Sequence, residues 1–280
     1  MVWNPTTSTT TGFLVPLTGK VASFIWTTED GTISAWTGGL TPANNAVLAV
    51  NNANVPNATL GAVYKGLAVG VNANGVSVNG GTDFVLLFVT NFRAGTIDVF
   101  DAGFNQVTPG TPGKIDGNFT DADIPFGYAP FGIQNINGDL FVTYAKQNAT
   151  KHDDDAGKGR GFVDVFDTDG HLLRRFASRG ALNSPWGVAR ASQAFGRFSG
   201  DILVGNFGDG RINAFASDGN FLGQLRDTNG KPISIDGLWT LTLGGGAKSS
   251  QDTMYFTAGP NSETDGLFGT ITPAQDIDDN

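Results

Sequence analysis

The sequence contains no cysteine, which excludes disulfide bonds, thiolate metal ligands and cysteine nucleophiles. It has only two histidines, so a copper or iron centre built from several histidines is excluded as well. Charged residues make up only 15% of the chain, and the 26 acidic residues outnumber the 17 basic ones. The net charge of −9 argues against nucleic acid and anionic membrane surfaces as partners, because both require a basic face.

Long apolar runs are missing too. No run approaches the ~18 residues that a membrane-spanning helix needs, so we expect no membrane insertion. Residues 1–12 lack the basic start and apolar core of a signal peptide. The chain has no Gly-x-Ser-x-Gly elbow for a serine nucleophile and no Gly-x-x-x-x-Gly-Lys-Ser/Thr loop for nucleotide phosphates.

Glycine, by contrast, is abundant, with 40 residues. Because glycine is costly inside helices, this composition disfavours a helical fold. Val, Ile, Thr, Phe and Trp gather in runs of about five to eight residues between Gly, Asn and Asp turns. The sequence therefore predicts an all-β protein, long enough to bury a sizeable core.

One hairpin motif occurs several times in the sequence. "TTEDGTISAW" (27–36), "VTNFRAGTIDVF" (89–100), "GRGFVDVF" (159–166) and "VGNFGDGRINAF" (204–215) share a turn followed by a strand that ends in an aromatic residue. Their apolar anchors lie 64, 66 and 49 residues apart, at Ile33, Ile97, Val163 and Ile212. A second phrase, rich in small residues, precedes most hairpins, with anchors at Gly66, Gly132, Gly187 and Thr240.

Two motifs that repeat in a constant order indicate stacked supersecondary units. The unit reads as four antiparallel strands, which is the blade of a β-propeller, and the small-residue phrase suits the crowded innermost strand. We expect a single propeller domain over 1–280, with five blades at about 1–58, 59–124, 125–182, 183–235 and 236–280. A β-sandwich or β-helix is the alternative, but neither explains the repeated order.

These hairpins, together with "GYAPFGIQNI", "LNSPWGVA", "IDGLWTLTLG" and "FTAGPNSETDGLFGTI", closely resemble a family of uncharacterised microbial β-propeller proteins. That family is related to the NHL-repeat and TolB-like propellers. The resemblance runs from end to end and implies an extracellular or cell-envelope location. It also implies six blades and leaves the function open, because no activity is established for the family.

The chain resembles a member shortened by about one amino-terminal blade, since "MVWN" is similar to the family's second inner strand. The last repeat shows three clear strands, so closing the ring would need a strand from "TTGFLVPL" (11–18). An unclosed ring would expose a strand edge, through which two chains could pair. A monomer and a dimer therefore both remain open.

In such propellers the turn after the second strand and the entry to the inner strand share one face. This predicts a ligand site at the channel mouth, since a concave site with convergent polar groups is the default binding site. The turn candidates are Glu29, Asp30, Asn91, Arg93, Lys146, His152, Asn206, Asp209, Asn261 and Glu263. The inner-strand candidates are Lys65, Phe131, Trp186 and Trp239. For Asn91 and Asn206 we favour a role in turn geometry, and for Phe131 and Trp186 a role in packing.

The segment "KQNATKHDDDAGKGRG" (146–161) replaces the short turn of the other blades. His152 and three consecutive Asp suit Mn, Fe or Zn, but the spacing does not fit a calcium loop. A disordered, self-neutralising loop is the interpretation we favour over a metal loop.

Two classes of function remain. The first is a non-catalytic extracellular binding or scaffold module that holds a protein, a glycan or a small molecule and requires no cofactor. The alternative is a divalent-metal-dependent hydrolase of the gluconolactonase-like propeller type. In it Glu29, Asn91, Asn206 and Glu263 would hold a cation such as Ca²⁺. No catalytic acid–base pair stands out in the sequence, so we favour the binding module.

Overall fold

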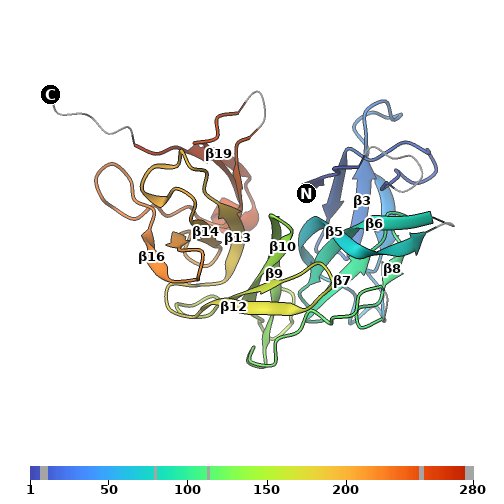
Figure 1. Ribbon diagram of the computed structural model, residues 1–280, viewed down its shortest axis with the longest axis horizontal. Helices are drawn as coiled ribbons and strands as arrows, with labels where there is room; N and C mark the ends of the chain where they lie inside the picture. The colour runs from blue at the N-terminus through green and yellow to red at the C-terminus, as the bar shows by residue number, and fades with distance from the viewer. Residues whose placement is uncertain (7–11, 79–80, 112–113, 246–248, 275–280) are drawn as a thin grey trace. The chain divides into compact units, whose positions relative to one another are not determined.

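The computed structural model describes residues 1–6, 12–78, 81–111, 114–245 and 249–274, and almost all of their regular structure is β-strand (Figure 1). The strands form five antiparallel sheets, each a blade, so the expected five-bladed β-propeller is confirmed. Among the described residues, no helix is long and apolar enough to cross a bilayer.

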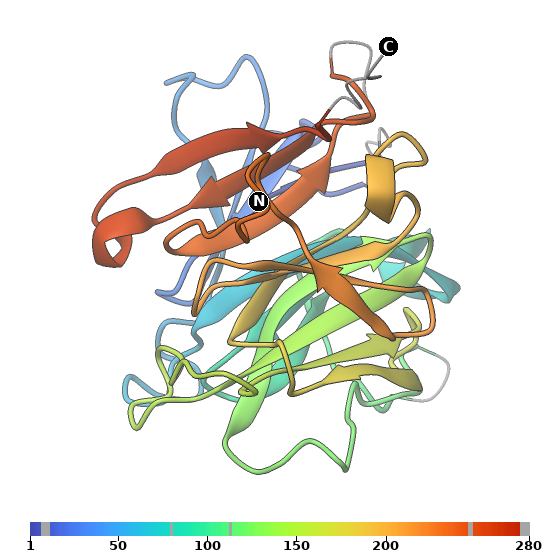
Figure 2. The ribbon, with the colours of Figure 1, turned by 90° about the vertical axis from the view of Figure 1, so that its left-hand side faces the viewer.

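The first three sheets each hold four strands. The first has β1 (Val2–Trp3), β2 (Phe24–Thr27), β3 (Thr32–Trp36) and β4 (Val47–Asn51). The second has β5 (Tyr64–Val78), β6 (Gly81–Asn91), β7 (Thr96–Phe100) and β8 (Gln106–Val107). The third has β9 (Tyr128–Ile136), β10 (Asp139–Lys146), β11 (Phe162–Phe166) and β12 (Leu172–Ser178); β9 and β10 are the long green strands of Figure 2.

The last two sheets differ in size. The fourth has β13 (Pro185–Arg190), β14 (Ile202–Asn206), β15 (Ile212–Phe215) and β16 (Phe221–Gln224). The fifth has only three strands within the described residues, β17 (Leu238–Leu243), β18 (Met254–Ala258) and β19 (Leu267–Ile271). A short 3-10 helix, η1 (Gly196–Phe198), and one turn labelled α1 (Pro260–Glu263) are the helical elements described.

The chain divides into two compact units. Unit 1 comprises Met1–Asp155 and Asp164–Arg175, and unit 2 comprises Ala156–Val163 and Phe176–Asn280. Each has its own apolar core. Ile25, Ile33, Leu87 and Phe100 are buried in unit 1, and the core of unit 2 includes Leu203, Ile212, Leu238, Leu241 and Met254.

The repeated hairpin turns share the same backbone conformation at one glycine. Gly31, Gly95 and Gly210 all have a positive φ, of 73°, 74° and 67°. Each donates its N–H to the carbonyl three or four residues earlier, on Thr28, Asn91 and Asn206. Glycine adopts this left-handed conformation without steric cost, which explains why glycine occupies this position in each of the three turns.

The inner strands of neighbouring blades approach closely within each unit. A Cβ atom on Gly66 of β5 would lie 3.0 Å from the backbone nitrogen of Ile133 in β9, and one on Gly187 of β13 would lie 2.8 Å from the nitrogen of Leu241 in β17. The interpretation of the small-residue phrase as the crowded inner strand agrees with these contacts.

The strand expected from 11–18 to close the ring takes a different place. Residue 11 lies outside the described residues, whereas Phe13 and Val15 are fully buried in the unit 1 core. Leu14 forms an isolated antiparallel bridge with Val21 instead of joining the β17–β19 sheet. The prediction is therefore wrong for the described part of this segment, because Phe13 and Val15 fill the unit 1 core together with Ile25 of β2 and Ile33 of β3.

Thr90 joins two blades of unit 1. Its buried hydroxyl accepts a hydrogen bond from the Gly66 N–H at 2.7 Å and donates to the Phe131 carbonyl at 2.8 Å. Thr143 of β10 accepts in the same way from the Gly132 N–H, at 2.8 Å. These hydroxyls satisfy the backbone where the pairing register of β5 with β6 and of β9 with β10 shifts.

We expect Thr90→Val to lower the free energy of unfolding by about 2–3 kcal/mol, since it leaves a buried N–H and a buried carbonyl without their partner. Urea denaturation monitored by tryptophan fluorescence measures the change. Thr108→Val, at an exposed position, is the matched control and is expected to change stability by less than ~0.5 kcal/mol. Equal losses in the two variants would contradict the role given to the Thr90 hydroxyl.

Candidate functional site

Three blades of unit 1 bring four charged or titratable side chains together. Glu29 lies in the β2–β3 turn, Lys65 at the start of β5, and His152 and Asp153 in the long loop between β10 and β11. We call these four residues the Lys65 cluster. Lys65 and Asp153 are 88 positions apart in the sequence, so the packing of the blades is what joins them.

Lys65 is the centre of the cluster. Its side chain is only 3% exposed, and its ammonium group pairs with Glu29 and, at 3.3 Å, with Asp153. The same nitrogen lies 6.0 Å and 5.8 Å from the ring centres of Phe92 and Phe131. The two carboxylates and two aromatic faces together stabilise an ammonium ion at a position where an unpaired charge would be very costly.

His152 completes a closed ring of contacts. Its Nδ1 lies 3.0 Å from Asp153 Oδ1 and 3.8 Å from Glu29 Oε2. Burial alone would raise the pKa of Asp153, but the hydrogen bond with His152 and the charge of Lys65 outweigh burial and lower it. Asp153 is therefore an ionised hydrogen-bond acceptor at neutral pH.

The loop that carries His152 and Asp153 is ordered by its own hydrogen bonds. Gln147 and Asp154 form an antiparallel bridge, the Asn148 N–H donates to the Asp153 carbonyl at 2.8 Å, and Lys146 pairs with Asp155 at 2.6 Å. The expectation of a disordered loop is therefore wrong, although the pairing of Lys146 with Asp155 shows that the loop does neutralise charge internally.

The cluster leaves carboxylate oxygens open to solvent. Glu29 and Asp153 are 37% and 53% exposed. Each uses one oxygen on Lys65, and within the described part of the chain neither Glu29 Oε2 nor Asp153 Oδ2 has a hydrogen bond. The open groups are thus acceptors, which suit a ligand that brings hydroxyl or ammonium donors.

The same residues resemble a metal site in composition. One ligand atom each from Glu29, His152 and Asp153 lies within 4.8 Å of the others, and carboxylates with an imidazole suit Zn²⁺ or Mn²⁺. However, the Lys65 ammonium already touches both carboxylates. It supplies the positive charge that a cation would bring, and it would repel one.

Asn91 and Asn206 occupy matching turns and make matching contacts. Asn91 Oδ1 accepts from the Val63 and Ala94 N–H groups, and its amide donates to Asp98 at 3.0 Å. Asn206 Oδ1 accepts from the Asn183 N–H, and its amide donates to Asp209 at 3.0 Å. Because these amides hold the turns together, the contacts favour the role in turn geometry over that of cation ligands.

The other expected rim residues have individual places. In unit 1, Asp30 is exposed beside Glu29, Arg93 donates to the Gly61 carbonyl at 2.8 Å, and Phe131 is buried on Phe92. In unit 2, Trp186 packs on Phe207, and Trp239 donates its indole N–H to Glu263 at 2.6 Å. Asn261 donates to Asp265 at 2.7 Å. The structure thus brings Glu29, Lys65, His152 and Phe131 together in unit 1, and Trp239 with Glu263 in unit 2.

Comparison with known proteins gives relatives of unknown function. Two uncharacterized proteins of Acanthamoeba polyphaga mimivirus are each 37% identical to the chain, over 77% and 69% of its length. The aligned regions cover 53% and 47% of those proteins, so the chain spans about half the length of the curated relatives it matches. No family model matches the sequence.

Solved structures with a similar fold are remote. They include a protein of unknown function from Bacteroides caccae (9% identity, TM-score 0.47, 91% of this chain and 73% of that one). A glucose dehydrogenase has 12% identity and a TM-score of 0.45 over 90% of this chain and 75% of that one. A gluconolactonase from Xanthomonas campestris has 14% identity and a TM-score of 0.38 over 89% and 82%. Similarity at this level concerns the fold and carries no activity over to this chain.

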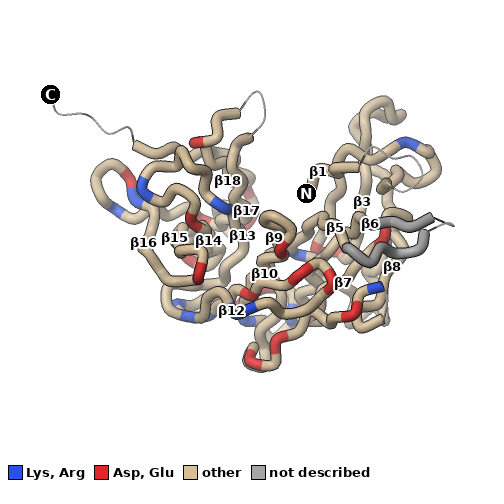
Figure 3. Tube along the Cα trace, in the orientation of Figure 1, with Lys and Arg blue, Asp and Glu red and all other residues tan. Residues whose placement is uncertain are grey.

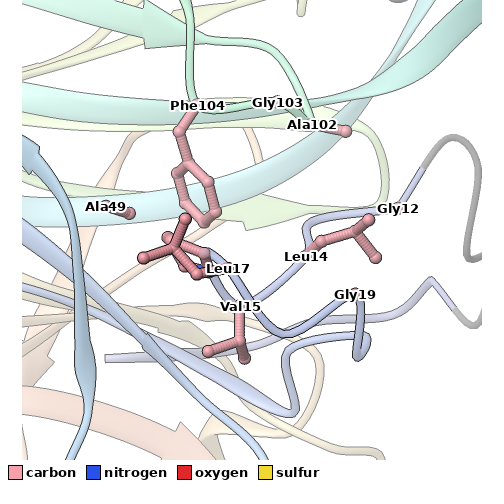
Figure 4. Close-up of a pocket in the computed structure, with 10 residues that line it drawn as sticks. Gly12, Leu14, Val15, Leu17, Gly19, Ala49, Ala102, Gly103 and Phe104 are labelled. Carbon is pink, nitrogen blue, oxygen red and sulfur yellow. The ribbon is translucent and has the colours of Figure 1, made fainter.

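A hollow of about 320 Å³ in unit 1 has a different character (Figure 4). Its lining is apolar or glycine, with Leu14, Val15, Leu17 and Phe104 around it, and Figure 4 shows the Phe104 ring directed toward Leu17. No expected site residue lines it. Without a polar side chain the hollow offers no directional recognition, so the Lys65 cluster is the better site candidate.

Sequence analysis missed one buried ionic group in unit 1. Arg175 of β12 pairs with both Asp164 of β11 and Asp121, whose side chains are 0% and 7% exposed. Burial raises the pKa of Asp164 to about 6 despite the charge of Arg175, and burial together with the Asp164 charge also raises the pKa of Tyr144. Figure 3 marks the acidic and basic residues along the chain, and most of the others lie outside strands or at strand ends. An Asp inside the strand "FVDVF" was therefore the available signal.

Proposed function

We propose that this protein is a non-catalytic binding module and that the Lys65 cluster recognises the hydroxyl groups of a glycan. The observation that carries this proposal is the pair of carboxylates held by one buried lysine, each with a half-exposed oxygen left open. Charge-assisted hydrogen bonds from ligand hydroxyls to such oxygens are strong and directional. The extracellular location implied by the family resemblance is part of the same proposal.

The state of the charged groups supports binding rather than acid–base catalysis. Lys65 is held as an ammonium by two carboxylates, so it has no free electron pair for a nucleophile or base. The lowered pKa of Asp153 keeps that side chain ionised, so it accepts hydrogen bonds rather than donating a proton. Ordered acceptors at fixed positions are what a preformed binding site needs.

An array of neutral and amino-sugar oligosaccharides tests the proposal. We expect the wild-type protein to retain a subset of these glycans and the Glu29→Gln/Asp153→Asn double variant to bind them at least about tenfold more weakly, because two charge-assisted acceptors are lost. The two amides keep an oxygen for Lys65, so the fold is expected to persist, and thermal melting verifies it.

Asp30→Asn is the matched control, since Asp30 is an exposed neighbour of Glu29 outside the Lys65 cluster. It is expected to leave glycan binding unchanged. An array on which the wild type retains no glycan, or on which the double variant binds as well as the wild type, would contradict the proposal.

A further inference from the structure

A second hollow, of about 580 Å³, lies in unit 2 and is lined by Lys158, Gly180, Ala181, Asp209, Arg211, Phe221 and Gln224. These residues come from the β10–β11 loop, the β12–β13 loop, the β14–β15 turn and β16. Its volume falls in the range of small-molecule sites, which is about 300–1,000 Å³. The proposed glycan site, in unit 1, shares none of these residues.

Within the described part of the chain, the two basic side chains of this hollow pair with no acidic residue, unlike some of the basic side chains elsewhere. Lys65, Lys146 and Arg175 are in ion pairs. Within the described ranges, neither Lys158 nor Arg211 has an ion pair or a side-chain hydrogen bond, although the protein carries a net charge of −9. Two cations facing one hollow in an acidic protein form a local site for a negative charge.

Asp209, the acidic residue of the hollow, forms its hydrogen bonds within the β14–β15 turn. Its Oδ1 accepts from the Asn206 amide at 3.0 Å and from the Arg211 N–H at 3.2 Å. Against its single charge, Lys158 and Arg211 leave the lining with one positive charge in excess. An incoming anion therefore meets an attractive field even with Asp209 ionised.

Asn183 connects the segments that carry the two cations. Its Oδ1 accepts from the Gly157 N–H at 2.6 Å, and its backbone carbonyl accepts from the Gly208 N–H at 3.2 Å. Its own N–H donates to Asn206 Oδ1 at 3.1 Å. The loop of Lys158 and the turn of Arg211 are thus joined through one buried residue, so the backbone segments that carry the two cations are held together before a ligand arrives.

An exposed aromatic side chain also lines the hollow. Phe221 of β16 is 52% exposed, and its ring packs edge-on against Phe215 at 5.6 Å, which holds it in place. An exposed, supported aromatic ring offers a face to a flat ligand. We propose that this hollow binds a small organic anion, with its carboxylate or phosphate between Lys158 and Arg211 and its flat body on Phe221.

Titration of the full chain with phenyl phosphate, benzoate and inorganic phosphate, followed by NMR chemical shifts, tests this inference. We expect saturable binding of phenyl phosphate or benzoate with a Kd below about 1 mM. Whichever of phenyl phosphate and benzoate binds more tightly shows whether the site prefers a phosphate or a carboxylate group. Arg211→Gln and Lys158→Gln should each weaken binding at least about fivefold, through loss of a charge-assisted contact.

Phe221→Ala should weaken phenyl phosphate and benzoate and leave inorganic phosphate unaffected, since phosphate alone has no flat body. Arg226→Gln and Lys231→Gln are controls at exposed positions of the same unit and should change nothing. Two results would overturn the inference: no saturable binding of any probe up to about 10 mM, or equal weakening by the site variants and the controls. Because the glycan array probes unit 1, failure here is distinguishable from failure there.

Discussion

Arg175→Met is expected to lower the free energy of unfolding by about 3–5 kcal/mol at pH 7, since removing one partner of a buried ionic group leaves uncompensated charge. Here the loss leaves two carboxylates, Asp164 at 0% exposure and Asp121 at 7%. One oxygen of Asp164 and the Tyr144 hydroxyl are already buried without a hydrogen-bond partner among the described residues. The Tyr144 hydroxyl is a neutral donor, so it cannot replace the positive charge of the guanidinium.

The pKa of Asp164 determines in which direction the stability changes with pH. The pKa of Asp164 is about 6 in the folded protein, against an ordinary value of 3.8, so the folded state binds this proton more tightly than the unfolded state does. The contribution of Asp164 to stability is thus fully present below pH 4 and is lost as the pH rises through 6. The shift corresponds to about 3 kcal/mol.

Thermal melting between pH 4 and pH 7.5 measures both effects. In Arg175→Met the loss should be smaller at pH 4.5, where Asp164 takes up a proton, than at pH 7. Adding Asp164→Asn to Arg175→Met should restore part of the stability at pH 7, because it removes one of the two buried charges. Arg226→Met, at an exposed arginine, is the matched control and is expected to cost less than ~0.5 kcal/mol. A pH-independent loss in Arg175→Met would contradict the electrostatic account.

Lys65→Met is expected to make the Lys65 cluster bind Zn²⁺ at least about 100-fold more tightly than the wild type does. At about 4 Å, an ammonium and a divalent ion repel each other by about 8 kcal/mol at an effective dielectric constant of 20. Solvent screening at the half-exposed carboxylates reduces this figure, and 100-fold corresponds to about 2.8 kcal/mol. Methionine retains the length and the apolar contact with Phe92 and Phe131.

Isothermal titration with Zn²⁺ measures the change. The Lys65→Met/Asp153→Asn double variant is the control, because it lacks one of the three ligands and should lose the gained affinity. If the wild type binds Zn²⁺ as tightly as Lys65→Met, the ammonium does not block the site. In that case the metal-dependent hydrolase becomes the better proposal, and a lactone and aryl-ester screen of the zinc-loaded protein would follow.

Local features were predictable because they depend on neighbours in the chain. The hairpins around Gly31, Gly95 and Gly210 form by hydrogen bonds that span three or four residues, so their turn residues can be recognised in the sequence. The close approach at Gly66 and Gly187 was predictable for a related reason, since small residues at a repeated position indicate crowding. Together these features predict the blades and hence the fold class.

The partners of the charged side chains could not be predicted in the same way. Glu29, Lys65 and His152 were each candidates, but no local pattern says that the Lys65 ammonium lies between Glu29 and Asp153 and so replaces a cation. The same holds for Arg175, whose two carboxylate partners lie 11 and 54 positions away. Residues 11–18 show the limit clearly, since their apolar side chains suit a closing strand and a core segment equally well.

By itself the sequence determined the repeated hairpins, the glycines that turn them and the all-β propeller they build. Only the tertiary structure decided which charges meet, which asparagines hold turns, and which cations remain without a partner. The physical reason is the distance along the chain over which each interaction acts. Turn geometry is set by hydrogen bonds within a few residues, whereas the environment of a charge depends on side chains that the packing of separate blades brings within a few ångströms.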